Sequence, residues 1–469
     1  MIPMPKSVQV LQGHFSLQNL KSISTQAQFL EEAQNIATIL GLPAQVGEPA
    51  EGRIHFAYTP LENPEAYKLE VSSDRVIIAA SGGAGLFYGV QTLRQLQTPA
   101  SIEDAPRFAW RGSHLDVSRH FMSLEWIKTY VDRLAQCKMN VLHLHLTDDQ
   151  GWRLEIKKYP RLSEIGAWRK KTRVGHELAP DKSFDDTPHG GYYTQEQLRE
   201  LVEYAKKRHV TIVPEIEMPG HATAALAAYP EFGNTGIAPE VACTWGVFES
   251  VFAPTEATFA FLEDVLSEVL EIFPSRYIHI GGDECPKTEW KNSEIAQEVM
   301  RQNNLHNEEE LQSYFVGRIN RFLQSKNRAM IGWDEILEGG LTQGATVMSW
   351  RGEEGGITAA KAGHDVIMTP GIPTYFDHYQ TTTPELEPLA IGGCNTLEMV
   401  YNYDPVPTVL SPLEAQRILG SQCQLWTEYM PTPKDVERMA FPRLYALAEV
   451  LWGKTQHDFA DFQRRLEAL

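Results

Sequence analysis

The sequence predicts an α/β protein in which a (β/α)8 barrel of the TIM type follows a small α/β domain, an α+β sandwich. Three observations support this fold class. The chain has 469 residues, which is too long for one ordinary core and suits two domains. From about residue 109 onward, eight short apolar segments alternate with amphipathic helical patterns. Polar and aromatic side chains follow each apolar segment, as expected where barrel strands end at a functional face.

The first domain is predicted to span residues 1–107. Residues 68–81, KLEVSSDRVIIAAS, predict two strands around a polar turn at residues 72–74. The glycine-containing stretch that follows predicts a helix with apolar side chains on one face. Residues 98–108 contain two prolines and show little periodicity. They are therefore interpreted as the linker to a barrel domain of residues 108–469.

The barrel domain is predicted from its strands and from the caps of its helices. The expected strands are HLDV (114–117), NVLHLHL (140–146), TIVPEI (211–216), YIHI (277–280), AMIGW (329–333), TVMSW (346–350), DVIMT (365–369) and CQLWT (423–427). Thr194 and Gln197 predict a capping box, and Ser123 predicts another helix start. A doubly wound open sheet is the alternative, but no glycine fingerprint follows the first strand.

Composition and charge narrow the possible partners. The net charge of −19 disfavours nucleic acid and anionic membranes, and a neutral or cationic ligand fits better. No apolar run approaches the roughly 18–20 residues of a membrane span.

The five cysteines lack a CxxC pattern and are expected to be reduced. The first residues lack a hydrophobic signal core, which predicts a cytoplasmic protein, or a secreted or periplasmic one whose leader has been removed.

The residues that follow the predicted strands indicate a carbohydrate site. The eight strands lead into DVSRH, LTDDQGW, EIEMPGH, GGDE, GWDE, SWRG, PGIPTYFD and LWTE. Carboxylates and arginine suit sugar hydroxyls, and flat aromatic rings suit the apolar face of a sugar. Asp283 and Glu284 stand side by side after the fourth strand. Two neighbouring carboxylates are costly to bury unless one is protonated or both are engaged, so this pair indicates chemistry.

These motifs, in this order, resemble the β-N-acetylhexosaminidases of glycoside hydrolase family twenty, and residues 67–96 resemble the α/β domain that precedes the barrel in that family. The resemblance implies exo-acting, retaining removal of a terminal β-linked N-acetylglucosamine or N-acetylgalactosamine. It also implies that the substrate's own 2-acetamido group attacks the anomeric carbon and forms an oxazolinium intermediate. The expected partners are N-acetylhexosamine-terminated oligosaccharides or glycoconjugates. No cofactor and no metal are expected.

The resemblance assigns the reacting groups residue by residue. Glu284 matches the acid that protonates the leaving oxygen and then activates water. Asp283 matches the carboxylate that orients the acetamide and balances the developing charge. The charge of Asp283 and partial burial are expected to keep Glu284 protonated near neutral pH. Asp148 and His221 match a supporting relay behind Glu284.

The resemblance also assigns the residues that hold the sugar. Arg119 matches the arginine that binds the 3- and 4-hydroxyls, and Glu428 matches the acid that holds the 4- and 6-hydroxyls. The acetamide pocket and the platform under the sugar match Trp333, Trp350, Trp426, Tyr375 and Asp377. Glu217 stands where many relatives have Asp, which leaves its role open.

Three rival interpretations remain at this point. His143, His145, Asp148 and Asp149 form an HxHxxDD pattern that suggests a metal-dependent hydrolase, although both histidines are more simply barrel-interior residues. A sugar-binding protein without catalysis is the second rival. Release of a disaccharide is the third, since the insertion at residues 168–192 is expected to shape the site entrance. The sequence does not indicate the oligomeric state or the preferred linkage.

Overall fold

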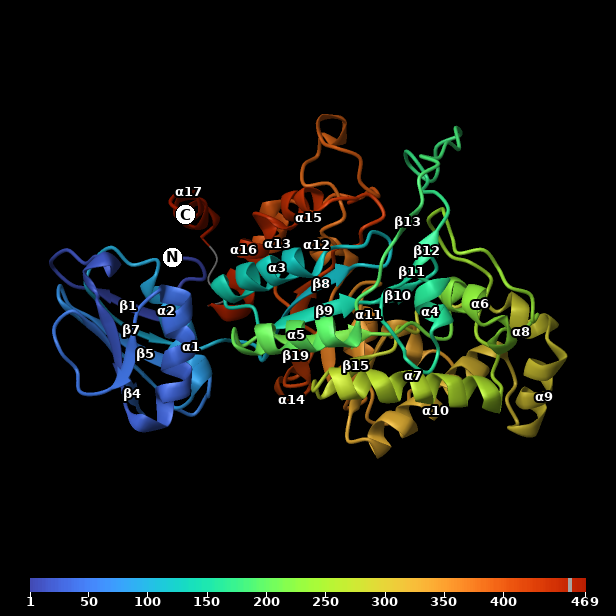
Figure 1. Ribbon diagram of the computed structural model, residues 1–469, viewed down its shortest axis with the longest axis horizontal. Coiled ribbons are helices and arrows are strands. Elements are labelled where there is room, and N and C mark those ends of the chain that lie inside the picture. The colour runs from blue at the N-terminus through green and yellow to red at the C-terminus, as the bar shows by residue number, and fades with distance from the viewer. Residues whose placement is uncertain (454–457) are drawn as a thin grey trace.

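The computed structural model describes residues 1–453 and 458–469 and shows a small domain beside a large barrel domain (Figure 1). The small domain contains a seven-stranded mixed sheet in the order β1-β7-β5-β6-β4-β2-β3. Its strands are β1 Ser7–Val10, β2 Ser22–Thr25, β3 Ala44–Val46, β4 Arg53–Tyr58, β5 Tyr67–Val71, β6 Arg75–Ala80 and β7 Ala100–Asp104.

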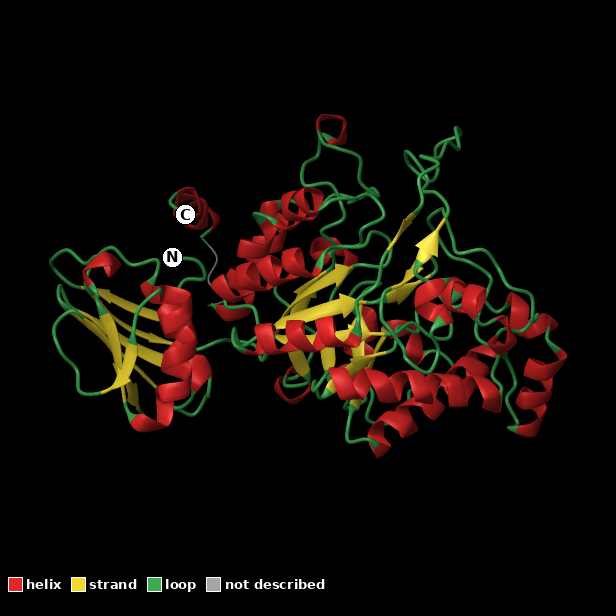
Figure 2. Cartoon of the chain, in the orientation of Figure 1, coloured by secondary structure: helices red, strands yellow, loops and turns green. Residues whose placement is uncertain are grey.

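Two helices, α1 (Leu30–Leu40) and α2 (Gly83–Leu93), cover the face of this sheet that is turned toward the barrel (Figure 2). The predicted strand pair is confirmed, because β5 and β6 pair antiparallel with Val71 opposite Val76. Buried and exposed residues alternate along β5, so one face of the sheet packs against the helices.

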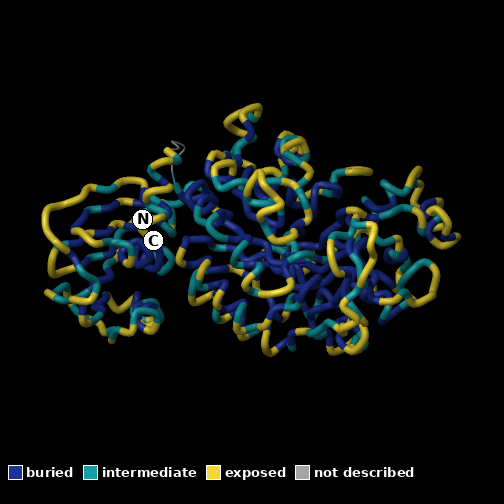
Figure 3. Tube along the Cα trace, turned by 90° about the horizontal axis from the view of Figure 1, so that it is seen from above, coloured by how far each residue is buried: buried dark blue, intermediate teal, exposed yellow. Residues whose placement is uncertain are grey.

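Eight parallel strands close into the predicted barrel. They are β8 Trp110–Asp116, β9 Val141–His145, β14 Thr211–Glu215, β15 Tyr277–His279, β16 Ala329–Trp333, β17 Thr346–Ser349, β18 Val366–Met368 and β19 Ile418–Cys423. The centre of the barrel is the most continuously buried part of the chain (Figure 3). Short strands β10 Thr147–Asp148, β11 Gly151–Trp152, β12 Trp168–Arg169 and β13 His189–Gly190 extend the loops above it.

Amphipathic helices surround the barrel. The main ones are α3 Leu124–Gln136, α5 Gln195–Lys206, α7 Glu256–Ile272, α10 Glu308–Ser325, α11 Glu354–Lys361 and α16 Arg443–Trp452. Shorter helices are α4 Arg161–Glu164, α6 Thr223–Ala228, α8 Thr288–Asn292, α9 Glu294–Gln302, α12 Gly371–Thr374, α13 Leu397–Tyr401, α14 Pro412–Ala415, α15 Pro433–Ala440 and α17 Phe459–Glu467. The predicted caps are confirmed: Thr194 and Gln197 form a capping box on α5, and Ser123 caps α3. None of the described helices combines the length and apolarity needed to cross a bilayer.

Two sequence predictions about elements are wrong. The eighth barrel strand is Ile418–Cys423 and not residues 423–427, because its sequence ILGSQC places glycine and polar residues at buried positions and so lacks an apolar run. Residues 98–108 are not simply a linker, because Ala100–Asp104 forms β7, which pairs with both β1 and β5. The acid at the end of β7, Asp104, is buried because it meets partners in the barrel domain.

Buried polar contacts join the two domains. Asp104 accepts hydrogen bonds from Lys138 Nζ at 3.0 Å, Tyr67 Oη at 2.6 Å and Trp452 Nε1 at 2.9 Å. Glu65 forms a two-pronged ion pair with Arg111, at 2.7 and 2.9 Å. The arginine and the lysine are fully buried. A buried charge is tolerated only when it is paired, so these contacts fix the two domains against each other.

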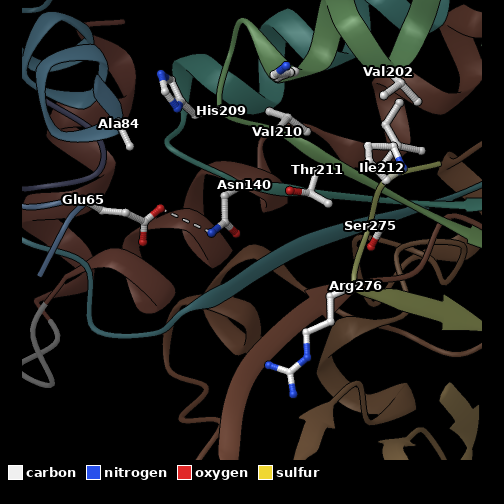
Figure 4. A pocket seen from close by; sticks show the side chains of 12 residues that line it. Glu65, Ala84, Asn140, Val202, His209, Val210, Thr211, Ile212, Ser275 and Arg276 are labelled. Atoms are coloured by element: carbon white, nitrogen blue, oxygen red, sulfur yellow. Dashed lines mark hydrogen bonds between the residues drawn. The ribbon is translucent and has the colours of Figure 1, made fainter. Parts of the chain in front are cut away.

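A cavity of about 430 Å³ lies at this junction (Figure 4). Glu65 and Ala84 line it from the small domain, and Asn140, Thr211 and Arg276 line it from the barrel. Thr211 begins β14 and Arg276 directly precedes β15, so the cavity faces the N-terminal end of the barrel strands. In barrels of this type that end serves stability, while chemistry takes place at the opposite end.

Candidate active site

A second cavity, of about 320 Å³, lies at the C-terminal ends of the barrel strands. Every predicted site residue except Asp148 lines it. The lining residues are Arg119, His221, Asp283, Glu284, Trp333, Trp350, Tyr375, Asp377, His378, Ile391, Gly392, Gly393, Trp426 and Glu428. Asp148 lies directly behind the wall, with 1% of its side chain exposed. The structure therefore brings together residues that are up to 309 positions apart, from Arg119 to Glu428.

The turn after β15 presents the two adjacent acids to the pocket. Gly281 has a φ of +69°, and a Cβ there would lie 1.7 Å from Glu217 Oε2, so only glycine fits. Glu284 itself has a φ of +43°, and His221 has a φ of +48°. This left-handed conformation costs a non-glycine residue about 1–2 kcal/mol and is concentrated at functional sites.

His221 contacts both acids through one nitrogen. Its Nε2 lies 3.4 Å from Glu284 Oε2 and 3.6 Å from Asp283 Oδ2. Its Nδ1 lies 2.8 Å from Asp149 Oδ2 and 3.2 Å from Asp148 Oδ1. The predicted partner Asp148 is therefore in contact with His221, but Asp149 is nearer. Two adjacent acids look alike in a sequence, so their distances to His221 could not be ranked without the structure.

In the pair of Asp283 and Glu284, the pKa shifts favour a proton on Asp283 and not on Glu284. Burial raises the pKa of Asp283 to about 7, although His221 lowers it. The hydrogen bond with His221 lowers the pKa of Glu284 below its ordinary value. The carboxylates of Asp148 and Asp149 raise the pKa of His221 well above 6.5, despite its burial, so it is a cation next to Glu284. The expectation that Glu284 holds the proton in the free protein is wrong for this reason.

Arg119 is held rigidly at one end of the pocket. Its guanidinium donates to Gln150 Oε1 at 2.8 Å and to Asp116 Oδ2 at 3.2 Å, and it lies 2.8 Å from Asp148 Oδ2. Glu428 Oε1 lies 3.7 Å away. A planar donor group beside a carboxylate is suited to neighbouring hydroxyls of one sugar.

Aromatic rings form the walls of the pocket. Trp333 Nε1 donates to Glu215 Oε1 at 2.9 Å, and Trp350 Nε1 donates to Glu335 Oε2 at 2.9 Å. Trp350 stacks on Tyr375 with ring centroids 6.1 Å apart. Both tryptophans are therefore oriented by a carboxylate, which leaves their apolar faces for a ligand.

Three buried acids in or near the pocket have raised pKa values. Burial, and then the charge of Asp283, raises the pKa of Glu335 to about 8. Burial, and then Glu428, raises the pKa of Asp377 well above its ordinary value. Glu217 is 2% exposed, and burial and Asp283 raise its pKa well above 4.5. It lies behind the glycine turn and does not line the pocket.

Beneath the pocket, the barrel interior contains a group of histidines around Glu215. His143, His145 and His279 are fully buried, which confirms that the HxH pattern belongs to the barrel interior. Nitrogens of all three lie within 3.0 Å of a Glu215 oxygen. Acids and histidines come close enough here for an ion to be considered. The contacts among these groups already account for their arrangement, and we assign no metal to them.

Sequence reasoning missed several residues at this site. His378 and residues 391–393 line the pocket although no strand-end motif contains them. His176, in the predicted entrance insertion, lies 3.0 Å from the Ile391 carbonyl oxygen, so the two loops meet beside the pocket. Glu215 and Glu335 lie within the quoted motifs EIEMPGH and GWDE, but no role was assigned to them.

Comparison with known proteins agrees with this geometry. The model of the glycosyl hydrolase family 20 catalytic domain matches residues 108–455, and that of domain 2 of the same family matches residues 1–109. A β-hexosaminidase of Porphyromonas gingivalis is 45% identical over 96% of this chain, and one of Vibrio furnissii is 37% identical over 96%. The chain spans 59% of the first protein's length and 76% of the second's.

Solved structures show the same arrangement of both domains. An exo-β-N-acetylglucosaminidase of Vibrio harveyi in complex with N-acetylglucosamine superimposes with a TM-score of 0.86. It is 32% identical, and the match covers 100% of this chain and 76% of that one. Family models that together cover nearly the whole chain, and a barrel that carries its acid pair and aromatic pocket at the strand ends, lead to one conclusion: the chain belongs to glycosyl hydrolase family 20.

Proposed function

We propose that this chain is an exo-acting, retaining β-N-acetylhexosaminidase that uses the substrate's acetamido group as the nucleophile. Its substrates are oligosaccharides or glycoconjugates that end in β-linked N-acetylglucosamine or N-acetylgalactosamine. The observation that carries the proposal is the contact of Asp283 and Glu284 with the same nitrogen of His221, at 3.6 and 3.4 Å. Two carboxylates on one side of a sugar cannot act from its opposite faces, so the attacking group comes from the substrate.

In the proposed reaction, Asp283 accepts the acetamide N–H and turns the acetamide oxygen toward the anomeric carbon. Because this hydrogen bond favours ionised Asp283, the proton of the acid pair moves to Glu284. Glu284 then gives it to the leaving oxygen while the acetamide oxygen forms the new bond to the anomeric carbon. Glu284 next takes a proton from water, which opens the oxazolinium ion and restores the original configuration.

The remaining pocket residues hold the sugar in this geometry. Arg119 and Glu428 bind hydroxyls at the end away from the leaving group. Trp333, Trp350 and Trp426 enclose the acetamide and support the ring, and Tyr375 donates to the acetamide oxygen beside Asp377. A closed aromatic pocket folds the acetamide inward. Binding therefore holds the acetamide oxygen close to the anomeric carbon that it attacks. Asp148 and His221 set the position and charge of the acid pair.

The experiment compares aryl glycosides that differ only in the 2-substituent, over roughly pH 4–8. We expect hydrolysis of the N-acetyl-β-glucosaminide or galactosaminide, and at least ~10³-fold less of the β-glucoside. A thiazoline that mimics the intermediate should compete with substrate. An enzyme ester at the anomeric carbon, trapped and detected by mass spectrometry, would refute the mechanism. Tight binding of both N-acetyl glycosides without turnover would instead indicate a sugar-binding protein.

A further inference from the structure

His145, near the end of β9, lies directly beneath the pocket and faces a carboxylate on each side. Its Nδ1 is 2.5 Å from Glu215 Oε2, and its Nε2 is 2.7 Å from Asp148 Oδ2. The ring is fully buried. It does not line the pocket itself, but it contacts Asp148 and Trp426, and Trp426 does line it.

Both carboxylates have further donors that hold them ionised. Asp148 lies 2.8 Å from Arg119 Nη2, and it accepts the backbone N–H of Asp149 at 2.6 Å. Glu215 accepts the indole N–H of Trp333 at 2.9 Å. An ionised carboxylate only accepts hydrogen bonds, so each nitrogen of His145 must carry a proton. The geometry therefore requires an imidazolium.

We propose that His145 is a positioning residue, a permanently charged imidazolium that connects the wall of the acetamide pocket to the acid pair. The connection runs through Trp333, Glu215, His145, Asp148, His221 and Glu284, and each neighbouring pair in this series is 2.5–3.4 Å apart. This role rests on the proposed function, because Glu284 acts as the acid only in that function. The buried cation offsets the charge of Asp148 and so limits how much negative charge surrounds Glu284 and Asp283.

The charged groups around His145 support this assignment. Its ring faces Glu215 from β14, Asp148 from β10, Glu217 at 3.9 Å, and the neutral rings of His114 and Trp426. The carboxylates of Glu215 and Asp148 raise its pKa to about 10, although burial acts in the opposite direction. Burial lowers the pKa of His114 well below 6.5, so His114 adds no competing charge.

His143 provides a matched control on the same strand. It is also fully buried, and its Nε2 lies 3.0 Å from the same Glu215 oxygen. Its Nδ1, however, accepts a hydrogen bond from Gln422 Nε2 at 2.9 Å, so it can carry only one proton. Burial lowers its pKa to about 4. His143 is thus a neutral neighbour that contacts Glu215 but not Asp148.

The first test compares His145→Gln with His143→Gln in the full chain. Loss of a buried cation raises the pKa of nearby acids, so His145→Gln should move the alkaline limb of kcat/KM upward by about one pH unit. It should also lower kcat by on the order of tenfold. His143→Gln should leave the alkaline limb in place, even if it lowers stability. Equal displacement of the limb in both variants, or no displacement in either, would overturn the proposal.

The second test needs no turnover and no folded His145 variant. In protein labelled with ¹⁵N-histidine, His145 and His221 should remain doubly protonated at about pH 9, where exposed histidines are neutral. His221→Gln should remove one of the two imidazolium signals and leave the other. Absence of a remaining imidazolium would refute the charge assigned to His145. A protein that lacks the proposed activity but keeps this signal would refute the proposed function alone.

Discussion

Asp283 and Glu284 share one proton in the free protein, and this predicts the alkaline limit of activity. Burial raises the pKa of Asp283 to about 7, while His221 lowers that of Glu284. The reaction needs one proton on the pair, wherever it resides before binding. Above about pH 7 the pair loses this proton and no acid remains, so kcat/KM should fall as pH rises. A pH profile on an aryl N-acetylglucosaminide that stays flat to about pH 9 would contradict this.

Replacement of Glu284 by Gln should affect substrates according to their leaving groups. Natural glycosides need a strong acid, so their kcat/KM should fall by about 10²–10⁴-fold. Aryl glycosides with an activated leaving group should lose much less. Steady-state kinetics on a disaccharide and on a nitrophenyl glycoside measure the difference. Equal losses on the two substrates would contradict the role of Glu284 as an acid.

Replacement of Asp283 by Asn should impair catalysis more than substrate binding. The neutral amide cannot balance the charge that develops on the acetamide, so kcat should fall by about 10²–10³-fold while KM changes little. Affinity for a thiazoline intermediate mimic should fall with kcat. Calorimetric titration of that mimic is the measurement, and unchanged affinity would rule out the assigned role.

The sequence predicted which residues meet at the site, but not how their protons are distributed. Residue types and motif order were sufficient to gather the pocket residues around Asp283 and Glu284. The distances from His221 to Asp148 and Asp149 depend on backbone geometry, and adjacent acids look alike in a sequence. The charge of His145 likewise follows from Glu215 and Asp148, and Glu215 lies 70 positions away in the sequence.

At the scale of elements, prediction worked where helices and strands carry local signals. The capping box of α5 and the hairpin of β5 and β6 are encoded by neighbouring residues. The prediction of strand β19 was wrong because its polar residue Gln422 is buried by partners far away in the sequence. Gln422 accepts a hydrogen bond from Trp110 Nε1 and donates one to His143 Nδ1. Strand β7 was missed because its buried end is Asp104. Polar residues that are buried by distant partners leave no hydrophobic pattern to read.

The cap of α5 offers a direct test at this scale. The Thr194 side chain accepts a hydrogen bond from the backbone N–H of Gln197. The Gln197 side chain in turn accepts one from the backbone N–H of Thr194. Thr194→Ala should lower the free energy of unfolding by about 1 kcal/mol, because it removes an acceptor from the helix start. Denaturant titration measures the loss. Thr194→Ser keeps the hydroxyl and is the control, and an equal loss in that variant would argue against capping as the cause.

At the scale of the whole molecule, buried charged residues join the two domains. Lys138 is fully buried against Asp104, whereas Lys68 pairs with Glu103 on the surface. Lys138→Ala leaves Asp104 buried without its cation and should cost about 3–5 kcal/mol of stability. Lys68→Ala should cost less than about 1 kcal/mol. Thermal unfolding of both variants checks this, and similar midpoints would show that the junction contributes little.

The chain ends also meet at this junction. Arg465 in α17 donates to the Met1 carbonyl oxygen at 2.8 Å and pairs with Glu449 in α16 at 2.7 Å. Figure 1 shows α17 beside the small domain rather than beside the barrel strands. The first and last segments of the chain therefore support each other, which no local sequence pattern could have indicated.

The filled barrel beneath the pocket has a consequence for the proposed hydrolysis of a glycan. Trp426 packs on His114 at 4.2 Å between ring centroids, and Trp333 packs on His279 at 4.8 Å, so there is no exit through the floor. In the proposed reaction, a glycan would enter by its non-reducing end, and the remainder would leave before the released sugar could follow through the same opening. The proposed enzyme would therefore release its polymer after every cut, and added monosaccharide is expected to inhibit it by occupying the pocket.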